Sequence, residues 1–187
     1  MNTLAENSNV RPPLRIVELE DLFNSISTNG RDLGVFREVD SSAMPEKFRK
    51  LLAHNEHMTI AVEAFHGSTV SVEVLDSRRN DSLYIREILL HRTSDHKVVQ
   101  YGIVRLQLNA LDEAPRNEIL SEKIPLGRVL IEHNVLREVE LVDLWEITIS
   151  SKLASLLGVE LGTITYGRTA MIYFSEHPAL ELLEVVI

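Results

Sequence analysis

Cysteine is absent from the 187 residues of this sequence. Disulfide bonds, thiolate nucleophiles, Cys-ligated zinc sites and iron–sulfur clusters are therefore excluded. Basic residues are scarce as well, because 19 Lys and Arg face 28 Asp and Glu, which gives a formal net charge of −9. A nucleic-acid surface needs a surplus of Lys and Arg on one face to neutralise phosphates. The sequence therefore predicts chemistry carried by oxygen and nitrogen groups, and no nucleic-acid partner.

Long hydrophobic runs are also missing. The longest, such as residues 124–131 and 182–187, fall far short of the roughly 20 apolar residues that cross a bilayer. The first fifteen residues contain Asn, Ser, Glu and Pro instead of a basic segment followed by an apolar one, so they do not have the pattern of a signal peptide. We expect a cytoplasmic protein with no membrane partner.

The short motifs of several enzyme classes are absent too. The glycines form neither G-x-G-x-x-G nor G-x-x-x-x-G-K-[ST], no serine lies in G-x-S-x-G, and H-E-x-x-H does not occur. His54 with His57, and His91 with His96, have no third ligand at a helical or strand offset. We therefore expect no metal and no nucleotide or other cofactor.

What is present is the composition of an ordinary globular protein, with 44% hydrophobic and 25% charged residues. Residues 1–13 are polar, end in two prolines and show no hydrophobic period, so we interpret them as a flexible N-terminus. The remaining residues, 14–187, contain no repeat and no low-complexity tract. They are predicted to form a single domain.

Hydrophobic spacing predicts the secondary structure, since steps of three and four indicate helices and alternation indicates strands. Strands in runs, without regular alternation with helices, favour an α+β fold. We predict one antiparallel sheet of about six strands with helices packed on one face. Helices are expected at residues 14–27, about 42–54, 58–65, 115–123 and 152–157, and a turn at 125–127. Strands are expected at about 69–75, 83–91, 98–108, 136–149, 163–174 and 179–186.

Three arginines lie in segments where a charge is unusual. Arg86 interrupts the apolar strand at residues 84–90, Arg168 lies within another strand, and Arg128 comes directly after Gly127, which could let a ligand approach the backbone closely. A guanidinium in such surroundings needs either a carboxylate of the protein or an anion brought by a ligand. Two interpretations remain open. The arginines could have structural roles, in an edge-strand ion pair for Arg86 and a plain turn for Arg128, or they could line an anion-binding pocket.

Glu184 in the terminal strand is the natural counterpart of these arginines. The rest of residues 182–186 is apolar, and an apolar environment would raise the pKa of the carboxyl and suit it to proton transfer. The alternative is a salt bridge from Glu184 to Arg86 or Arg168. From the residues alone we predict a small α+β domain with a pocket for an anionic organic ligand.

Read in order, these stretches resemble the chorismate pyruvate-lyase family, the enzymes that make 4-hydroxybenzoate. The resemblance lies in the Arg-Glu-Ile-Leu-Leu strand that starts at Arg86, the Pro-Leu-Gly-Arg stretch at 125–128, and the C-terminal strand with Glu184. Residues 58–59 and 69–72 are similar to the family's helix end and the strand that follows. The resemblance covers about two-thirds of the chain, from residue 58 to residue 186.

This resemblance implies a cofactor-independent carbon–oxygen lyase that eliminates pyruvate from chorismate in aromatic acid or quinone biosynthesis. Arg86 would bind a carboxylate of the ligand, helped by the backbone N–H of Leu126. Met58 would line the aromatic pocket, and Glu184 would face the hydroxyl or ether end of the ring. The implied partners are chorismate and an aromatic acid product, with the chain as a monomer or weak homo-oligomer.

Two further arginines are candidates for the second, enolpyruvyl carboxylate. Arg128, next to the substrate-binding Gly127, and Arg168 are assigned to this role.

The sequence departs from the family at one strand. Where the family has Ala or Gly followed by Arg and Thr, this chain has Tyr-Gly-Ile-Val at residues 101–104, so Ile103 replaces an arginine. Either Arg105 substitutes for it, or the ligand is held differently. Glu181 is a secondary substitute for Glu184.

Two alternatives stay open on the sequence. The chain could be a non-catalytic domain of the same fold that senses a small aromatic acid, as in bacterial transcription regulators. It could also be a lyase that gives a different hydroxybenzoate, or a catalytically degenerate relative.

Overall fold

The computed structural model describes residues 17–26, 30–135 and 137–187. The interpretation of residues 1–13 as a flexible N-terminus lies outside these residues. The described helices are α1 (Leu19–Ser25), α2 (Gly30–Leu33), α3 (Glu46–Leu52), α4 (Met58–His66), α5 (Glu113–Leu120), α6 (Leu126–Glu132) and α7 (Ser151–Leu157). The described strands are β1 (Gly34–Glu38), β2 (Val70–Arg79), β3 (Leu83–Arg92), β4 (Val98–Gln107), β5 (Arg137–Ile149), β6 (Ile164–Phe174) and β7 (His177–Val186).

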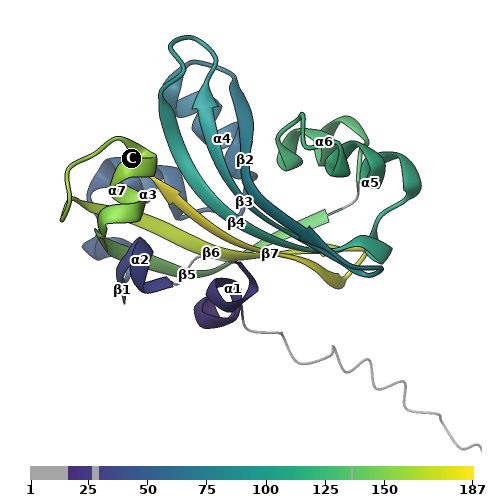
Figure 1. The fold of residues 1–187 in the computed structure, drawn as a ribbon, viewed down its shortest axis with the longest axis horizontal. Helices are drawn as coiled ribbons and strands as arrows, with labels where there is room; N and C mark the ends of the chain where they lie inside the picture. Colours follow the sequence, from purple (N-terminus) through teal and green to yellow (C-terminus); the bar gives the residue numbers. More distant parts are fainter. Residues whose placement is uncertain (1–16, 27–29, 136) are drawn as a thin grey trace, which may run out of the picture.

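The strands form one curved antiparallel sheet (Figure 1). Over the described residues it has seven strands in the order β1-β5-β6-β7-β4-β3-β2, and every neighbouring pair is antiparallel. The predicted α+β class and the single antiparallel sheet are confirmed. The additional strand is β1, whose side chains are exposed or half-buried and therefore carry no alternating apolar pattern. It is a strand because it pairs along β5.

Alternation along the strands gives the sheet two faces with separate cores. On one face, α3 and α4 and the pair α5 and α6 cover the sheet, and their apolar side chains pack with residues such as Ile88 and Leu182. On the opposite face, α1, α2 and α7 pack against residues such as Leu89 and Leu183. Figure 1 shows α1 and α2 below the sheet. The face covered by α3 to α6 is the one that contains the pocket described below.

The helix predicted at residues 58–65 is α4. It ends because Gly67 takes the left-handed conformation, at φ 60° and ψ 29°, which a residue without a Cβ adopts at no steric cost. The following strand, β2, continues to Arg79 instead of turning at Asp76, because a register shift between Val74 and Asp76 lets the pairing with β3 resume.

The turn predicted at residues 125–127 is wrong. Pro125 is the N-cap of α6 and Leu126 is its first residue, a position that suits the fixed φ of a preceding proline. Gly127 is helical, and its missing side chain serves packing instead. A Cβ at this position would lie 2.5 Å from Thr59 Oγ1 on α4, so only glycine lets the two helices meet this closely.

Candidate functional site

A small pocket with a volume of about 50 Å³ lies between the sheet and the N-terminal ends of α4 and α6. Every site residue predicted from the sequence lines it except Arg128. The lining residues are His57, Met58, Thr59, Val72, Arg86, Ile88, Leu90, Gln100, Gly102, Val104, Pro125, Leu126, Gly127, Val139, Arg168, Ile172, Leu182, Leu183 and Glu184.

Arg86 on β3 is buried in this pocket without a full set of hydrogen bonds. It is 1% exposed, and its Nε and Nη1 atoms have no hydrogen-bond partner among the described residues. Burial lowers the pKa of the guanidinium, while the neighbouring Tyr84 and Glu122 act in the opposite direction. The Tyr84 hydroxyl donates to Glu122 Oε1 at 2.8 Å. The pocket therefore contains a buried cation whose Nε and Nη1 atoms find no acceptor within the part of the chain that the structure describes.

Arg168 on β6 is equally buried, but its guanidinium is well satisfied. Its Nε donates to Glu184 Oε2 at 2.7 Å, its Nη1 to the His54 carbonyl at 2.8 Å and its Nη2 to the Glu56 carbonyl at 3.1 Å. The ion pair follows from strand register, because Arg168 and Glu184 are directly opposite each other on β6 and β7. Of the two salt bridges left open by the sequence, the structure contains the one to Arg168 and not the one to Arg86.

Glu184 therefore follows the second of the two interpretations that its sequence allowed, a salt bridge to Arg168, and not the first, an unpaired carboxyl suited to proton transfer. The structure places it in the pocket wall, 7% exposed, with Oε2 held by a buried guanidinium. The alternation along β7 shows which neighbours of Glu184 on that strand are apolar. It does not show the ion-pair partner, Arg168, which lies on the neighbouring strand β6.

Met58 and Leu126 lie where the resemblance placed them. Met58 begins α4 and is 3% exposed. Leu126 begins α6, so its backbone N–H has no acceptor within the helix. Both line the pocket together with Gly127. The two helix ends and Arg86 thus surround one space.

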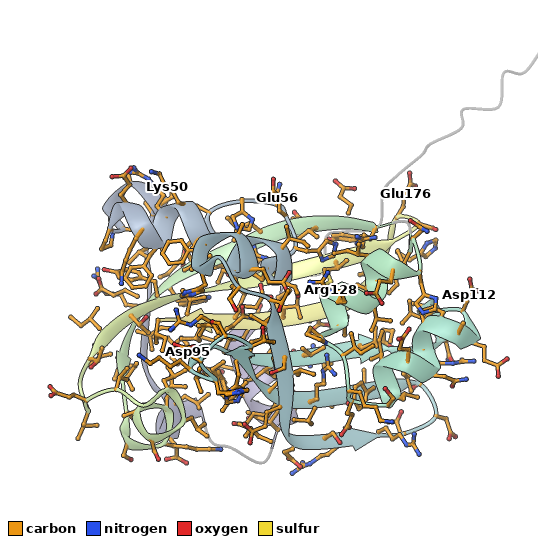
Figure 2. All side chains as sticks on the ribbon, turned by 90° about the horizontal axis from the view of Figure 1, so that it is seen from above. Lys50, Glu56, Asp95, Asp112, Arg128 and Glu176 are labelled. Carbon is orange, nitrogen blue, oxygen red and sulfur yellow. The ribbon has the colours of Figure 1, made fainter. Side chains whose placement is uncertain are left out.

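Arg128 lies outside the pocket lining. Its Nη2 forms an ion pair with Glu63 Oε2 on α4, and Figure 2 shows it on α6 over the same face of the sheet. Because α6 begins at Leu126, the side chain two positions later leaves the helix in a different direction. The arrangement gives the predicted binding of a ligand carboxylate by Arg128 no support, and shows a helix–helix contact instead.

Arg105 cannot replace the arginine that the family has at position 103. Ile103 packs in the core of the opposite face of the sheet, and a residue two positions further along a strand points the same way. Arg105 pairs there with Glu181 across β4 and β7. Neither Arg105 nor Glu181 lines the pocket.

His57 is a pocket residue that was not predicted, because its spacing from His54 indicated only half of a metal-binding pair. His57 is the N-cap of α4, and its Nε2 accepts a hydrogen bond from Arg137 Nε on β5. Burial, together with the charges of Arg137 and Arg168, lowers the pKa of His57 to about 4. A neutral ring whose Nε2 accepts carries its proton on Nδ1. No local pattern of residues indicates a hydrogen-bond partner 80 residues away.

Gln100 on β4 was also missed. It is 3% exposed, lines the pocket, and its Oε1 has no hydrogen-bond partner among the described residues. The available signal was a polar residue inside an apolar strand, two positions from Gly102 and therefore on the same face.

No group of three or more metal-ligating side chains occurs within the described parts of the chain. Over the same residues, no helix is long and apolar enough to cross a membrane.

Comparison with known proteins identifies the fold. No family model and no curated protein matches the sequence, so the resemblance to the chorismate pyruvate-lyase family gains no support from these comparisons. The effector domain of PhnF from Mycobacterium smegmatis aligns with a TM-score of 0.50 at 12% identity, over 70% of this chain and 87% of that one. A longer PhnF structure aligns with the same score and identity, over 71% of this chain and 64% of that one.

A transcriptional regulator (GntR family) from Enterococcus faecalis V583 aligns at a lower TM-score of 0.44, with 10% identity over 62% of this chain and 92% of that one. The alignment with PhnF shows that this chain has the fold of that effector domain. At such low identity, the likeness is one of fold and not of function.

Proposed function

We propose that this chain binds a small organic carboxylate in the pocket between the sheet and helices α4 and α6. The observation that carries the proposal is the guanidinium of Arg86, which is 1% exposed and has two donors without acceptors. A buried charge is costly unless it is paired and hydrogen-bonded. The guanidinium presents its N–H groups in a planar fork that matches a carboxylate, so an anionic ligand supplies the missing partner.

The rest of the pocket favours a ligand with a ring. Apolar side chains such as Met58, Ile88, Val104 and Leu182 line it, as in most small-molecule sites. Its volume of about 50 Å³ means that side chains in the pocket wall have to move when a ring enters. Arg168 is not available as a second carboxylate site in this arrangement, because its donors are used by Glu184 and two backbone carbonyls. A small aromatic or cyclic acid fits this combination.

The first candidate function is a ligand-binding domain that senses such an acid without converting it. Its fold is that of the PhnF effector domain. Glu184, the one acidic side chain in the pocket lining, is occupied by Arg168, which also favours binding over proton transfer.

The second candidate is the chorismate pyruvate-lyase activity implied by the resemblance. The specific observation in its favour is that Met58, Arg86, Leu126 and Glu184, which are 126 positions apart along the chain at the extremes, line one pocket. In that reaction Arg86 would hold the ring carboxylate, and the apolar walls would exclude water as the ring becomes aromatic. Glu184 would have to exchange its contact with Arg168 for the ether oxygen before it could move a proton. The product would be 4-hydroxybenzoate or another hydroxybenzoate.

A binding experiment tests the proposal that both candidates share. Calorimetric titration of the purified protein with benzoate, 4-hydroxybenzoate and chorismate is expected to show saturable binding of at least one of them. Arg86→Gln should weaken that binding about 10- to 100-fold, the loss expected for one charged hydrogen-bonding group. Arg37→Gln is the matched control, because Arg37 forms an exposed ion pair with Glu146 outside the pocket. Equal affinity in the wild type and Arg86→Gln would refute the site.

A turnover experiment separates the two candidates. The protein is incubated with chorismate, and pyruvate and hydroxybenzoates are followed by chromatography. Binding without product supports the sensing domain. Product in the wild type, lost in Glu184→Gln, supports the lyase, and the identity of the hydroxybenzoate defines its regiochemistry. Product formed at an undiminished rate by Glu184→Gln would contradict the role given to Glu184.

A further inference from the structure

The amide oxygen of Gln100 is a second polar group in the pocket without a hydrogen-bond partner among the described residues. Of the described residues that line the pocket, only Arg86 and Gln100 have buried side-chain polar atoms without one. Gln100 is 3% exposed, so water does not replace the missing partner freely. Leaving a buried amide oxygen unpaired costs most of its desolvation free energy. A group that enters with the ligand would remove this cost.

The strand register separates the two residues along the pocket face of the sheet. Arg86 on β3 is opposite Val104 on β4, whereas Gln100, four residues before Val104 on β4, is opposite Leu90. At about 3.3 Å per residue, the two backbone positions are about 13 Å apart along the sheet. Both side chains line the same pocket, so one ligand can contact both.

The surface between Arg86 and Gln100 is apolar. Gly102 lies midway along β4 between Gln100 and Val104, and the Ile88 side chain packs over it, because a Cβ at Gly102 would lie 3.3 Å from Ile88 Cγ1. The neighbours of Gly102 in the same row are Ile88 on β3 and Glu184 on β7. The Glu184 carboxylate accepts a hydrogen bond from Arg168. The Gln100 amide oxygen is the acceptor in the pocket lining that has no partner among the described residues.

We propose that Gln100 determines specificity by accepting a hydrogen bond from a hydroxyl group at the end of the ligand opposite its carboxylate. The ligand class is then a single ring with a carboxylate held by Arg86 and a hydroxyl held by the Gln100 side chain. This inference rests on the proposed binding of a ring carboxylate, and it adds the residue that distinguishes hydroxylated from unsubstituted acids. It assigns the hydroxyl end to Gln100, where the resemblance had placed Glu184.

The test is a two-by-two comparison of ligands and variants. Benzoate and 4-hydroxybenzoate are titrated calorimetrically into the wild type and into Gln100→Leu, which has a similar size but no polar group. We expect the wild type to bind 4-hydroxybenzoate about tenfold more tightly than benzoate, the value of one hydrogen bond. In Gln100→Leu this ratio should fall to about one, while the affinity for benzoate changes little.

Two controls make the result specific. Gln107→Leu changes a glutamine on the same strand that does not line the pocket, and it should keep the wild-type ratio. Gln100→Met repeats the loss of polarity in a more flexible side chain, in case the leucine variant does not fold. The position of the hydroxyl is checked with 2-hydroxybenzoate, which should show no preference that depends on Gln100.

The outcomes are distinguishable from those that test the proposed function. If the wild type binds neither benzoate nor 4-hydroxybenzoate, the ring-carboxylate proposal fails, and this inference fails with it. If both bind and the ratio persists in Gln100→Leu and Gln100→Met, only the role of Gln100 is refuted. An equal loss of affinity for both ligands would show that Gln100 supports the pocket structurally and does not select the hydroxyl.

Discussion

At the scale of single residues, the two buried arginines on the pocket face illustrate how one residue type takes two roles. Arg86 and Arg168 are both 1% exposed. Arg168 is fixed by Glu184 and by backbone carbonyls between α3 and α4, so it joins the sheet to the segment that leads into the pocket. Arg86 retains two unpaired donors, and this difference is what makes it the ligand-binding residue.

The difference predicts opposite effects on stability. Arg168→Met should lower the free energy of unfolding by about 3–5 kcal/mol, because it leaves the Glu184 carboxylate buried without its partner. Arg86→Met should be neutral or stabilising, since it removes a buried charge whose donors are not satisfied. Urea unfolding of the ligand-free proteins measures both values. Equal destabilisation by the two substitutions would show that Arg86 also has a structural role.

His57 gives a second prediction at this scale, one of pH dependence. Its folded-state pKa is lowered to about 4, whereas the ordinary value in an unfolded chain is about 6.5. The unfolded state therefore binds the proton first, and the stability contributed by neutral His57 is present above about pH 6.5 and is lost as the pH falls towards 4.

The measurement is urea unfolding at several pH values between 7 and 4.5. His57→Asn cannot take up the proton, so its free energy of unfolding should fall less steeply across this window than that of the wild type. His177→Asn is the control, because His177 is exposed at the start of β7 and should leave the wild-type slope intact. Parallel curves for wild type and His57→Asn would contradict the prediction.

At the scale of elements, the contact between α4 and α6 forms the cover of the pocket. The first residues of both helices line it, and two contacts hold the helices together. One is the ion pair between Glu63 and Arg128. The other is the close approach of Gly127 to Thr59, which leaves no room for a Cβ on α6.

Gly127→Ala is therefore expected to destabilise the protein by about 1–3 kcal/mol, the usual cost of overpacking. The added Cβ would lie 2.5 Å from Thr59 Oγ1 and 3.2 Å from Thr59 Cβ. Thr59→Ala removes the shorter contact, so the penalty should be smaller in the double variant. A double-mutant cycle of unfolding free energies measures this coupling, and strictly additive effects would show that the two helices do not meet as described.

At the scale of the whole molecule, the charge of the ligand site contrasts with that of the protein. The chain has a net charge of −9, yet its pocket holds a buried guanidinium with unpaired donors. An anionic ligand would supply the counter-charge. Because it binds the folded state and not the unfolded one, ligand binding raises the free energy of unfolding.

A ligand that occupies the pocket should therefore raise Tm. At a concentration 100 times Kd, stabilisation is about 2.7 kcal/mol, which corresponds to a rise of about 5–10 °C for a domain of this size. Differential scanning calorimetry with 4-hydroxybenzoate measures it. Arg86→Gln at the same ligand concentration should show a much smaller rise, and an equal rise in both proteins would indicate binding elsewhere.

Some of the fold and of the site could be predicted from the sequence, because these features depend on local patterns. The strands around Arg86, Arg168 and Glu184 follow from alternation. The spacing at residues 58–65 fits a strand as well as a helix, and the glycine at which α4 ends favoured the helix. Strand β1 and the start of α6 were not predicted. β1 exists through its pairing with β5, and α6 begins where packing of Gly127 on Thr59 favours a helix over a turn.

The sequence by itself determined the fold class and the set of polar residues on each strand, because alternation and helical spacing are properties of neighbouring residues. Only the tertiary structure decided which charges meet. Register placed Glu184 opposite Arg168. Packing left two nitrogens of Arg86 and the amide oxygen of Gln100 buried in one pocket without partners among the described residues. The physical reason is that the cost of burying a polar group depends on its partners in space, and those partners come from distant segments of the chain.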